Sequence, residues 1–359
     1  MVLKDSLSRV LRAVVQAAFA IFIGIGIGAI LMYAWEDCNP WTAYAALFRG
    51  AFFDVDGLAN TLSLAVPLML TGITFAIGVR AGLFNIGAEG QVYIGAVAAV
   101  AASLFVLPRG IHLLVAIIFC MGAGALWSLL PAVLKVTRGV HEVVSTIMLN
   151  WIAKYLCFYL VAGPLVNPSR PQRTISIAQS SRFSTLFGRA DFTTAIFAGV
   201  IFAMIIYVLL WHTTIGYELR AVGLNPEASR YGGISPWRST ITAFVLGGFA
   251  AGFAGGIRVI SLFPSYALDG GLTSVFNLGF DGIAVALIGR NHPIGAIFAA
   301  IFFAGLITGA GAMQMEAGIS VEMIRAVEGI IVIAIAIPEV LDTITSRLKI
   351  RRRVECQST

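Results

Sequence analysis

The sequence predicts an all-α, polytopic membrane protein with about ten transmembrane helices. Of its 359 residues, 58% are hydrophobic and only 12% are charged, and the mean hydropathy is +0.90. A soluble domain usually carries roughly twice that charged fraction. The apolar residues fall in long uncharged stretches, and about 20 such residues form a helix that crosses a bilayer core of about 30 Å. Because a segment in lipid must satisfy its own backbone polar groups, these runs indicate helices.

Ten apolar stretches are the expected spans. They cover residues 11–33, 59–79, 91–106, 111–134, 143–162, 192–211, 240–262, 275–288, 294–312 and 321–340. The first follows basic residues as a signal peptide does, yet its apolar run is too long and no small-residue cleavage site follows it. We therefore expect it to remain as a helix. The 38 glycines suit helices that pack closely in a membrane.

The distribution of lysine and arginine sets the expected orientation. Most of these residues fall in the loops that are inside when the N-terminus is cytoplasmic, which predicts both termini in the cytoplasm. The segment 163–191 is discordant, because it is placed outside although it carries four arginines. Moving it inside would add or remove a span and invert the balance elsewhere. We predict one transmembrane domain over residues 1–359, with a cytoplasmic loop at 213–238 and a basic cytoplasmic tail at 341–359.

Several classes of function are not indicated. The chain has a net charge of +6, but the charge is dispersed over short loops rather than gathered on a basic face, so no nucleic-acid partner is expected. His141 and Glu142 lack the second histidine of an HExxH zinc motif, and we expect no metal site. None of the four lysines stands in a GxxxxGK[ST] phosphate loop. We therefore expect no catalytic residues, no bound cofactor and no nucleotide site in this chain.

Two related motifs, FNIGAEG at 84–90 and FNLGFDG at 276–282, each begin near an unusually short span. Five spans separate them, so the second runs through the membrane in the opposite sense, which predicts an inverted repeat. Interrupted segments at matching places in two halves point to a transport pathway. The alternative role is simple helix packing. The candidate pathway residues are Phe84, Asn85, Glu89, Gln91, Phe276, Asn277 and Asp281, with Glu142 and Asn150 on a neighbouring helix.

We expect a broken helix at both motifs. In this prediction Asn85 and Asn277 cap the helix that follows, and Glu89 and Asp281 lie near its positive N-terminal end. Unpaired backbone groups at such a break are tolerated in a membrane only where protein or a water-lined cavity receives them.

The loop at 213–238 contains a predicted short surface helix. Asn225 is a good N-cap, Pro226 suits the first helical position, and Gly232 with Gly233 can end the helix. A plain cytoplasmic connector explains such a helix equally well.

Four motifs resemble a known family. The triplet Glu227-Ala228-Ser229, with Gly233 six residues after Glu227, resembles the EAA loop of ABC-transporter permeases, with Ser229 in place of the second alanine. The stretches FNIGAEGQ at 84–91, HEVVSTIMLN at 141–150 and GIAVALIG at 282–289, the last followed by Asn291-His292-Pro293, resemble the branched-chain amino acid, ribose and nucleoside permease superfamily. Within it, the chain is most similar to the larger permease subunit of bacterial nucleoside importers.

The resemblance implies a permease subunit of an ATP-driven importer, multi-pass in the bacterial cytoplasmic (inner) membrane. The implied partners are a second homologous permease, a cytoplasmic ABC ATPase that binds ATP and Mg, and an extracytoplasmic substrate-binding protein. The implied ATPase-coupling residues are Asn225, Pro226, Glu227, Ala228, Ser229, Arg230 and Gly233. The implied solute is a nucleoside; the alternatives are a simple sugar such as a pentose, or an ion-coupled secondary transporter.

Overall fold

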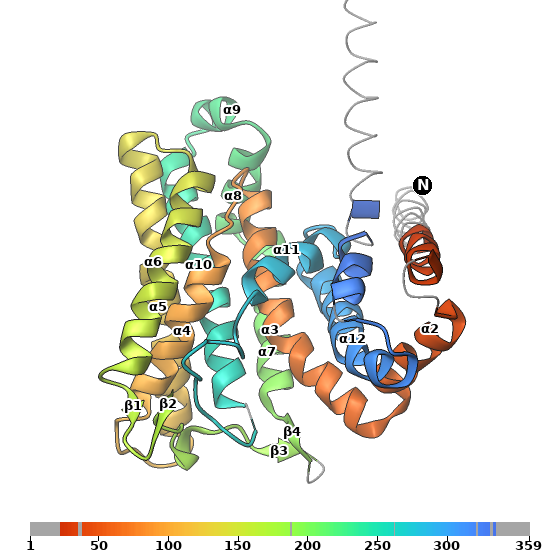
Figure 1. Ribbon diagram of the computed structural model, residues 1–359. Helices are drawn as coiled ribbons and strands as arrows, with labels where there is room; N and C mark the ends of the chain where they lie inside the picture. Colours follow the sequence, from red (N-terminus) through yellow and green to blue (C-terminus); the bar gives the residue numbers. More distant parts are fainter. Residues whose placement is uncertain are drawn as a thin grey trace, which may run out of the picture. The chain divides into compact units, whose positions relative to one another are not determined.

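The computed structural model describes residues 22–34, 38–186, 189–261, 263–320, 322–330 and 333–334. These residues are mostly helical (Figure 1). They divide into two compact units, Val55–Gly305 and the combination of Met1–Asp54 with Leu306–Thr359. The predicted basic tail, both termini, and parts of the first and last predicted spans lie outside the described residues.

Six described helices are long and apolar enough to cross a membrane, and three shorter apolar helices accompany them. The long helices are α3 (Val55–Arg80), α5 (Ile111–Arg138), α6 (Glu142–Ala162), α7 (Ala195–His212), α10 (Pro236–Ile260) and α12 (Pro293–Ala317). The shorter ones are Phe22–Ala34, α4 (Ala88–Ala102) and α11 (Leu278–Ile288). Apart from boundary shifts, every predicted span that falls within the described residues is a helix.

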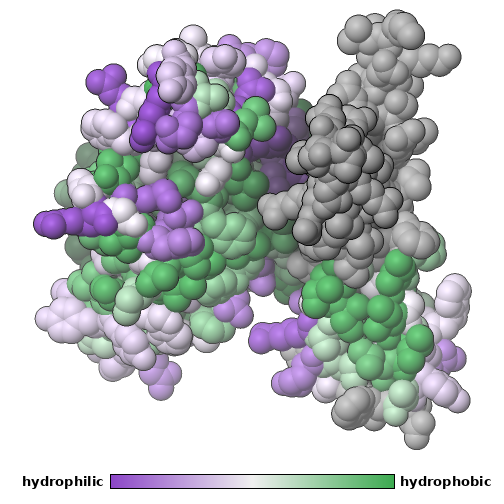
Figure 2. Space-filling model, turned by 90° about the horizontal axis from the view of Figure 1, so that it is seen from above, coloured by the Kyte–Doolittle hydropathy of each residue, from purple (hydrophilic) through white to green (hydrophobic). Residues whose placement is uncertain are grey.

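The centre of the larger unit is formed by α3 and α10. In their most apolar stretches 78% of the residues are buried, against 28% in α5, α6 and α7. The outer helices therefore turn apolar side chains outward. In the end-on view of Figure 2, exposed hydrophobic residues lie among hydrophilic ones. An apolar outer surface is unfavourable in water and suits a helix bundle in lipid.

Glycines bring the central helices into backbone contact. A Cβ atom added to Gly95 of α4 would lie against the backbone of Gly252 of α10, and one added to Gly252 would lie against the carbonyl oxygen of Cys120 in α5. On the other side of the core, a Cβ on Gly282 of α11 would meet Thr71 of α3. Close approach through small residues is the usual packing of membrane helices, since lipid provides no hydrophobic drive between them.

Both repeated motifs lie at helix breaks, as predicted. The first break separates α3 from α4 at residues 81–87, and the second separates α10 from α11 at residues 261–277. The chain leaves the helical path at Gly82, which has a φ of +71° that suits glycine. At both breaks, the larger unit therefore contains backbone that is not helical.

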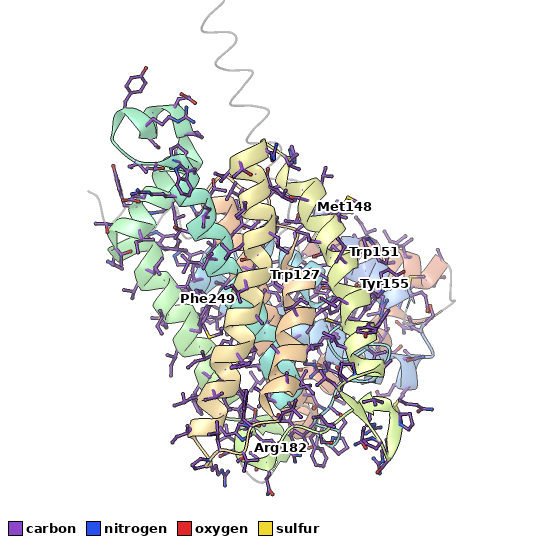
Figure 3. All side chains as sticks on the ribbon, turned by 90° about the vertical axis from the view of Figure 1, so that its left-hand side faces the viewer. Trp127, Met148, Trp151, Tyr155, Arg182 and Phe249 are labelled. Atoms are coloured by element: carbon purple, nitrogen blue, oxygen red, sulfur yellow. The ribbon has the colours of Figure 1, made fainter. Side chains whose placement is uncertain are left out.

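The segment after α6 departs from the all-α prediction. It forms two short antiparallel hairpins, β1 (Val166–Asn167) with β2 (Arg170–Thr174) and β3 (Thr185–Leu186) with β4 (Arg189–Thr193), and the short helix η2 (Gln179–Ser181). The segment packs on the second break: the Thr174 N–H donates to the Leu268 carbonyl at 2.9 Å, and the Arg182 guanidinium lies 3.9 Å from the centre of the Tyr266 ring. Figure 3 shows Arg182 at this end of the helices.

The smaller unit contains a helix that the sequence pattern missed. Its described helices are Phe22–Ala34, α2 (Pro40–Phe48), the π-helix η1 (Arg49–Phe53), the later part of α12 and residues 322–330. The Tyr44 hydroxyl donates to the Ile25 carbonyl at 2.8 Å, and Gly309 lies against the Leu47 backbone. The helix α2 was missed because it is too short to read as a span, although Asn39 caps it and Pro40 begins it.

We predict that Gly252→Val destabilises the bundle, because its side chain must enter the backbone contact among α10, α5 and α4. Overpacking of this kind costs about 3 kcal/mol or more where backbone must move. Thermal unfolding of the purified protein in detergent should show a clearly lowered midpoint. The matched control is Gly122→Ala in α5, since a Cβ at Gly122 meets no atom within 4 Å; equal midpoints for the two variants would contradict the prediction.

Candidate functional site

The two motifs meet at the buried carboxylate of Glu89. Its Oε1 accepts the backbone N–H of Asn277 at 2.7 Å, and its Oε2 accepts the backbone N–H of Gly279 at 2.7 Å. The Tyr93 hydroxyl, one helical turn further along α4, donates to Oε1 at 2.5 Å. Only 2% of Glu89 is exposed. A carboxylate of the first motif therefore caps the helix that begins in the second motif.

This contact depends on residue types that the second motif supplies. A Cβ on Gly279 would meet the Glu89 backbone, so only glycine allows α11 to come so close to α4. Asn277 has a φ of +64°, a left-handed conformation that asparagine tolerates better than most residues. The prediction that the Asn277 side chain caps α11 is wrong, because this N-cap makes no side-chain hydrogen bond and Glu89 takes the role. The predictions that Glu89 and Asp281 lie in the first turns of α4 and α11 are confirmed.

The first break is held by side chains of its own and of α6. Asn85 Oδ1 accepts the N–H of Gly87 at 2.9 Å, and Asn150 both accepts the N–H of Gly90 and donates to the carbonyl of Ile86, each at 2.9 Å. Asn85 therefore receives the N–H of Gly87, but the prediction that Asn85 caps α4 is wrong, because Gly87 is the N-cap and no side chain caps this helix. These backbone groups of the break are thus paired inside the protein, as a membrane requires.

Glu142, at the start of α6, joins the same arrangement. Its Oε2 lies 2.6 Å from the ammonium of Lys135, and its Oε1 accepts a long 3.4 Å hydrogen bond from the N–H of Phe84. The helix α6 thus touches the first break at two levels, through Glu142 and through Asn150.

Exposure divides the predicted pathway residues into three groups. Asn85, Glu89, Gln91, Glu142 and Asn150 are buried, while 45% of Phe84 and 44% of Phe276 are exposed. Asn277 and Asp281 are half-buried. Of these, Gln91 has a buried Oε1 atom that finds no partner among the described residues.

Sequence reasoning missed several residues of this site. Tyr93 and Gly279 complete the Glu89 contact, and Lys135 pairs with Glu142. Phe280, 42% exposed, presents a third half-exposed ring at the motifs. The signal for Tyr93 was its spacing of four residues from Glu89, which places both on one helix face.

A short helix on the connection between α7 and α10 matches the predicted surface helix. This helix, α9 (Pro226–Tyr231), begins after Asn225, whose Oδ1 accepts the N–H of Ala228 at 3.1 Å, and ends at Gly232. Gly233 follows with a φ of +79°. In Figure 1, α9 projects beyond the ends of the long helices. The preceding α8 (Thr214–Leu224) was not predicted, because its sequence is polar enough to read as loop.

The helix α8 leads directly to the first break. A Cβ on Gly223 would meet the carbonyl oxygen of Arg80, and a Cβ on Gly82 would lie 3.0 Å from the Gly223 Cα. The end of α8 and the turn after α3 are thus in backbone contact, with no flexible side chain between them.

Charged and aromatic groups strengthen this junction. Arg80 donates to the carbonyls of Asn291 and Arg290 at 3.0 and 3.2 Å, which ties α3 to the turn between α11 and α12. Arg80 and Arg220 both lie within 6 Å of the Trp211 ring centre, at 5.5 and 5.8 Å. The His292 ring packs on Trp211 at 4.5 Å, and burial together with the nearby Arg80 charge lowers the pKa of His292.

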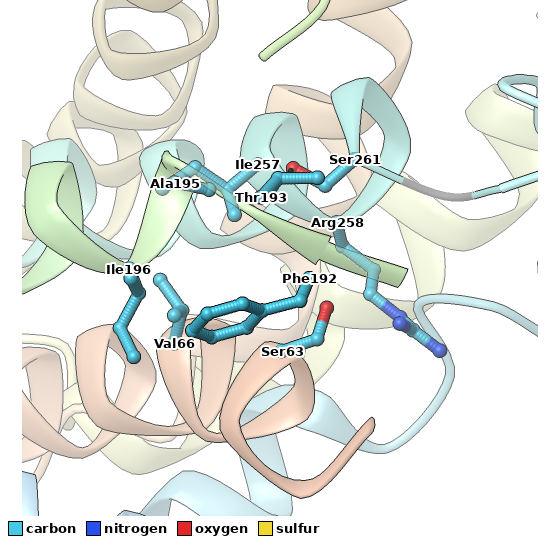
Figure 4. A pocket seen from close by; sticks show the side chains of 9 residues that line it. All are labelled: Ser63, Val66, Phe192, Thr193, Ala195, Ile196, Ile257, Arg258 and Ser261. Atoms are coloured by element: carbon cyan, nitrogen blue, oxygen red, sulfur yellow. Dashed lines mark hydrogen bonds between the residues drawn. The ribbon is translucent and has the colours of Figure 1, made fainter. Parts of the chain in front are cut away.

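A small cavity between α3, α7, β4 and α10 is lined partly by Ser63, Thr193 and Arg258 (Figure 4). Its volume of about 10 Å³ has room for one water molecule at most. It is far too small for an organic solute, so it is not a candidate for the pathway.

The sequence matches a known family over residues 57–336, described as the branched-chain amino acid transport system / permease component. The chain belongs to this permease family. The match confirms the resemblance drawn from the motifs and, with the apolar helices, indicates a multi-pass membrane protein.

Three relatives of this permease are informative. It is 36% identical over 335 residues to the guanosine ABC transporter permease protein NupP of Bacillus subtilis, covering 92% of this chain and 95% of NupP. It is 32% identical over 349 residues to the nucleoside ABC transporter permease protein NupB of Lactococcus lactis, covering 94% of each. It is 30% identical over 335 residues to the glucose ABC transporter permease protein TsgB13 of Haloferax volcanii, covering 87% of this chain and 84% of TsgB13.

These relatives come in pairs. The same two bacteria also have the permease proteins NupQ and NupC, each 28% identical to this permease over 68% and 70% of its length. The lower identity places this permease with NupP and NupB rather than with the second member of each pair.

We predict that Glu89→Leu destabilises this permease, because two buried N–H groups of α11 lose their acceptor. Each such loss costs about 1–3 kcal/mol. Tyr93→Phe, which removes one donor to the carboxylate, should have a smaller effect of about 1 kcal/mol. Thermal unfolding in detergent tests the ranking, with the exposed Glu218→Gln of α8 as control. A Glu89→Leu midpoint equal to that of the control would mean that the cap does not support the fold.

Proposed function

We propose that this permease is one membrane subunit of an ATP-driven importer of nucleosides. The observation that carries the proposal is its similarity to NupP and NupB, which extends over 92% and 94% of the chain. Both names specify a guanosine or nucleoside solute. The expected location is the bacterial cytoplasmic membrane, with a substrate-binding protein delivering the solute from outside.

A second, homologous permease completes the translocation path. The NupP–NupQ and NupB–NupC pairs support this arrangement, because each couples a relative like this chain with a more distant one. We further propose ten crossings, both termini in the cytoplasm and an inverted repeat. Two equivalent successions, α3–break–α4 and α10–break–α11, support the repeat.

The pathway in this proposal is lined by the half-exposed rings of Phe84 and Phe276. The buried polar residues Asn85, Glu89, Glu142 and Asn150 hold the two breaks in shape, and Gln91 is buried with them. This division follows burial, since a solute can touch an exposed ring but not a side chain enclosed by protein. Aromatic faces suit the planar base of a nucleoside.

A partner ATPase, which binds ATP and Mg, docks on α9. The exposed helix carries Glu227 and Arg230 in an ion pair of 3.4 Å, and 95% of Tyr231 and 88% of Leu224 are exposed beside it. Large exposed apolar residues next to a charged helix are typical of a protein interface. ATP itself is bound by the partner, because this sequence has no phosphate loop.

The contact between Gly223 and Gly82 gives α9 a route to the pathway. Movement of α9 carries α8 with it, and α8 lies in backbone contact with the turn that begins the first break. Because packed backbone transmits displacement with little give, closure of the ATPase would shift the FNIGAEG segment. Such a shift is what alternating access requires at a discontinuous helix.

A sugar is the second candidate solute. The similarity to TsgB13, a glucose permease protein, favours it, at 30% identity over 335 residues. Uptake of radiolabelled nucleosides and of glucose or ribose by the same reconstituted complex separates the two.

We predict that Glu227→Lys abolishes uptake and uncouples ATP hydrolysis from transport, while the complex still assembles. The reversed charge breaks the pair with Arg230 and faces the ATPase with the wrong sign. Uptake and ATPase activity in proteoliposomes measure the effect. Glu218→Lys, an equal charge change on exposed α8, is the control and should transport normally; unimpaired uptake by Glu227→Lys would refute ATPase docking through this residue.

We also predict that uptake requires ATP rather than an ion gradient. Vesicles loaded with ATP should accumulate the nucleoside, and vesicles with a proton or sodium gradient but no ATP should not. Gradient-driven uptake without ATP would instead support an ion-coupled secondary transporter.

A further inference from the structure

Lys154 places a cation far inside a membrane-spanning helix. It is the thirteenth of the 21 residues of α6, which puts it about 18 Å from the start of the helix at 1.5 Å per residue. Three aromatic rings surround its ammonium: Nζ lies 4.9 Å from the ring centre of Phe276, 5.2 Å from that of Trp151 and 5.7 Å from that of Phe158. The set is called the Lys154 cluster below.

The ammonium has no carboxylate partner within ion-pair distance among the described residues. Lys135, by contrast, pairs with Glu142 at 2.6 Å. Contacts with ring faces stabilise a cation by about 0.5–2 kcal/mol each, which does not offset transfer into hydrocarbon. A charged residue within a membrane span therefore lies against protein or a water-filled cavity rather than against lipid tails.

The cluster is open on one side. Trp151 is 55% exposed and Phe276 is 44% exposed, while Lys154 is half-buried beside them. Figure 3 shows Met148, Trp151 and Tyr155 along one face of α6, next to this position. The Lys154 cluster thus combines half-exposed aromatic rings with a half-buried ammonium at membrane depth.

The backbone next to Phe276 is anchored by a hydrogen bond. Its neighbour Asn277 donates its backbone N–H to Glu89, so the ring projects from the anchored end of the second break. Trp151 and Lys154 come from α6, which Asn150 ties to the first break. Contacts at both breaks therefore hold the residues of the Lys154 cluster in place. A residue that only faces lipid would not need such anchoring.

We propose that the Lys154 cluster is a recognition site for a nucleobase in the translocation path. The base stacks on the exposed face of Trp151 or Phe276, and the Lys154 ammonium donates a hydrogen bond to a carbonyl oxygen or ring nitrogen of the base. Stacking selects a planar ring, and the donor selects a base edge with an acceptor. The inference rests on the proposed importer function and specifies which residues meet the solute.

The test uses the full importer, reconstituted with ATP, in which Lys154 is replaced by cysteine. Lys154→Cys should lower nucleoside uptake by about tenfold or more, as expected for loss of a hydrogen bond to a charged donor. Aminoethyl methanethiosulfonate then attaches an ammonium on a chain of nearly lysine length, through a disulfide with release of methanesulfinate, and should restore uptake. The neutral methyl reagent should not restore it, and excess nucleoside should slow the labelling.

Three controls accompany this test. Tyr159→Cys, on the same helix and 70% exposed but outside the cluster, should transport normally with or without the reagent. The basal ATPase activity of the Lys154→Cys complex reports assembly independently of solute. Wild-type complex treated with the reagent accounts for the natural cysteines.

Normal uptake by Lys154→Cys, or restoration by the neutral reagent as well, would overturn the inference. So would a cysteine at 154 that the water-soluble reagents do not reach, because that places it in lipid. Failure of the untreated wild-type complex to import nucleosides would instead refute the proposed function, which separates the two failures.

Discussion

The structure depends on one carboxylate that joins two interrupted helices. Glu89 accepts the N–H groups of Asn277 and Gly279 and the hydroxyl of Tyr93, all in a buried position. Helix breaks leave polar backbone groups that a bilayer cannot solvate. Glu89 lies at the start of α4, just after the first break, and its carboxylate accepts backbone N–H groups at the second break. The conformation of each break therefore depends on the position of the other.

The neighbouring helix α6 serves both breaks. Asn150 pairs with the backbone at Ile86 and Gly90, Glu142 reaches Phe84, and Lys154 lies against Phe276. The polar residues of α6 thus fall where the irregular backbone needs partners, while its apolar residues remain exposed for lipid or for a partner chain.

The helix α8 links this arrangement to α9. Glycine contacts between α8 and the turn after α3, together with the contacts of Arg80 and Trp211, leave little freedom between the surface helix and the first break. Rigid packing at this junction and a discontinuous helix beyond it are the physical requirements for passing a displacement from a motor subunit to a pathway.

The sequence by itself determined the membrane class, most helix positions, the location of both breaks and the capped surface helix, because these follow from local hydropathy and from capping residues. It also pointed to Glu89 and Asn150 as polar residues with a role. Only the tertiary structure decided that Glu89 rather than Asn277 caps α11, that Phe280 and Lys154 join the exposed rings, and that α8 touches Gly82. Those pairings join residues far apart in the chain, and no local pattern records which buried donor a given carboxylate will meet once the helices pack.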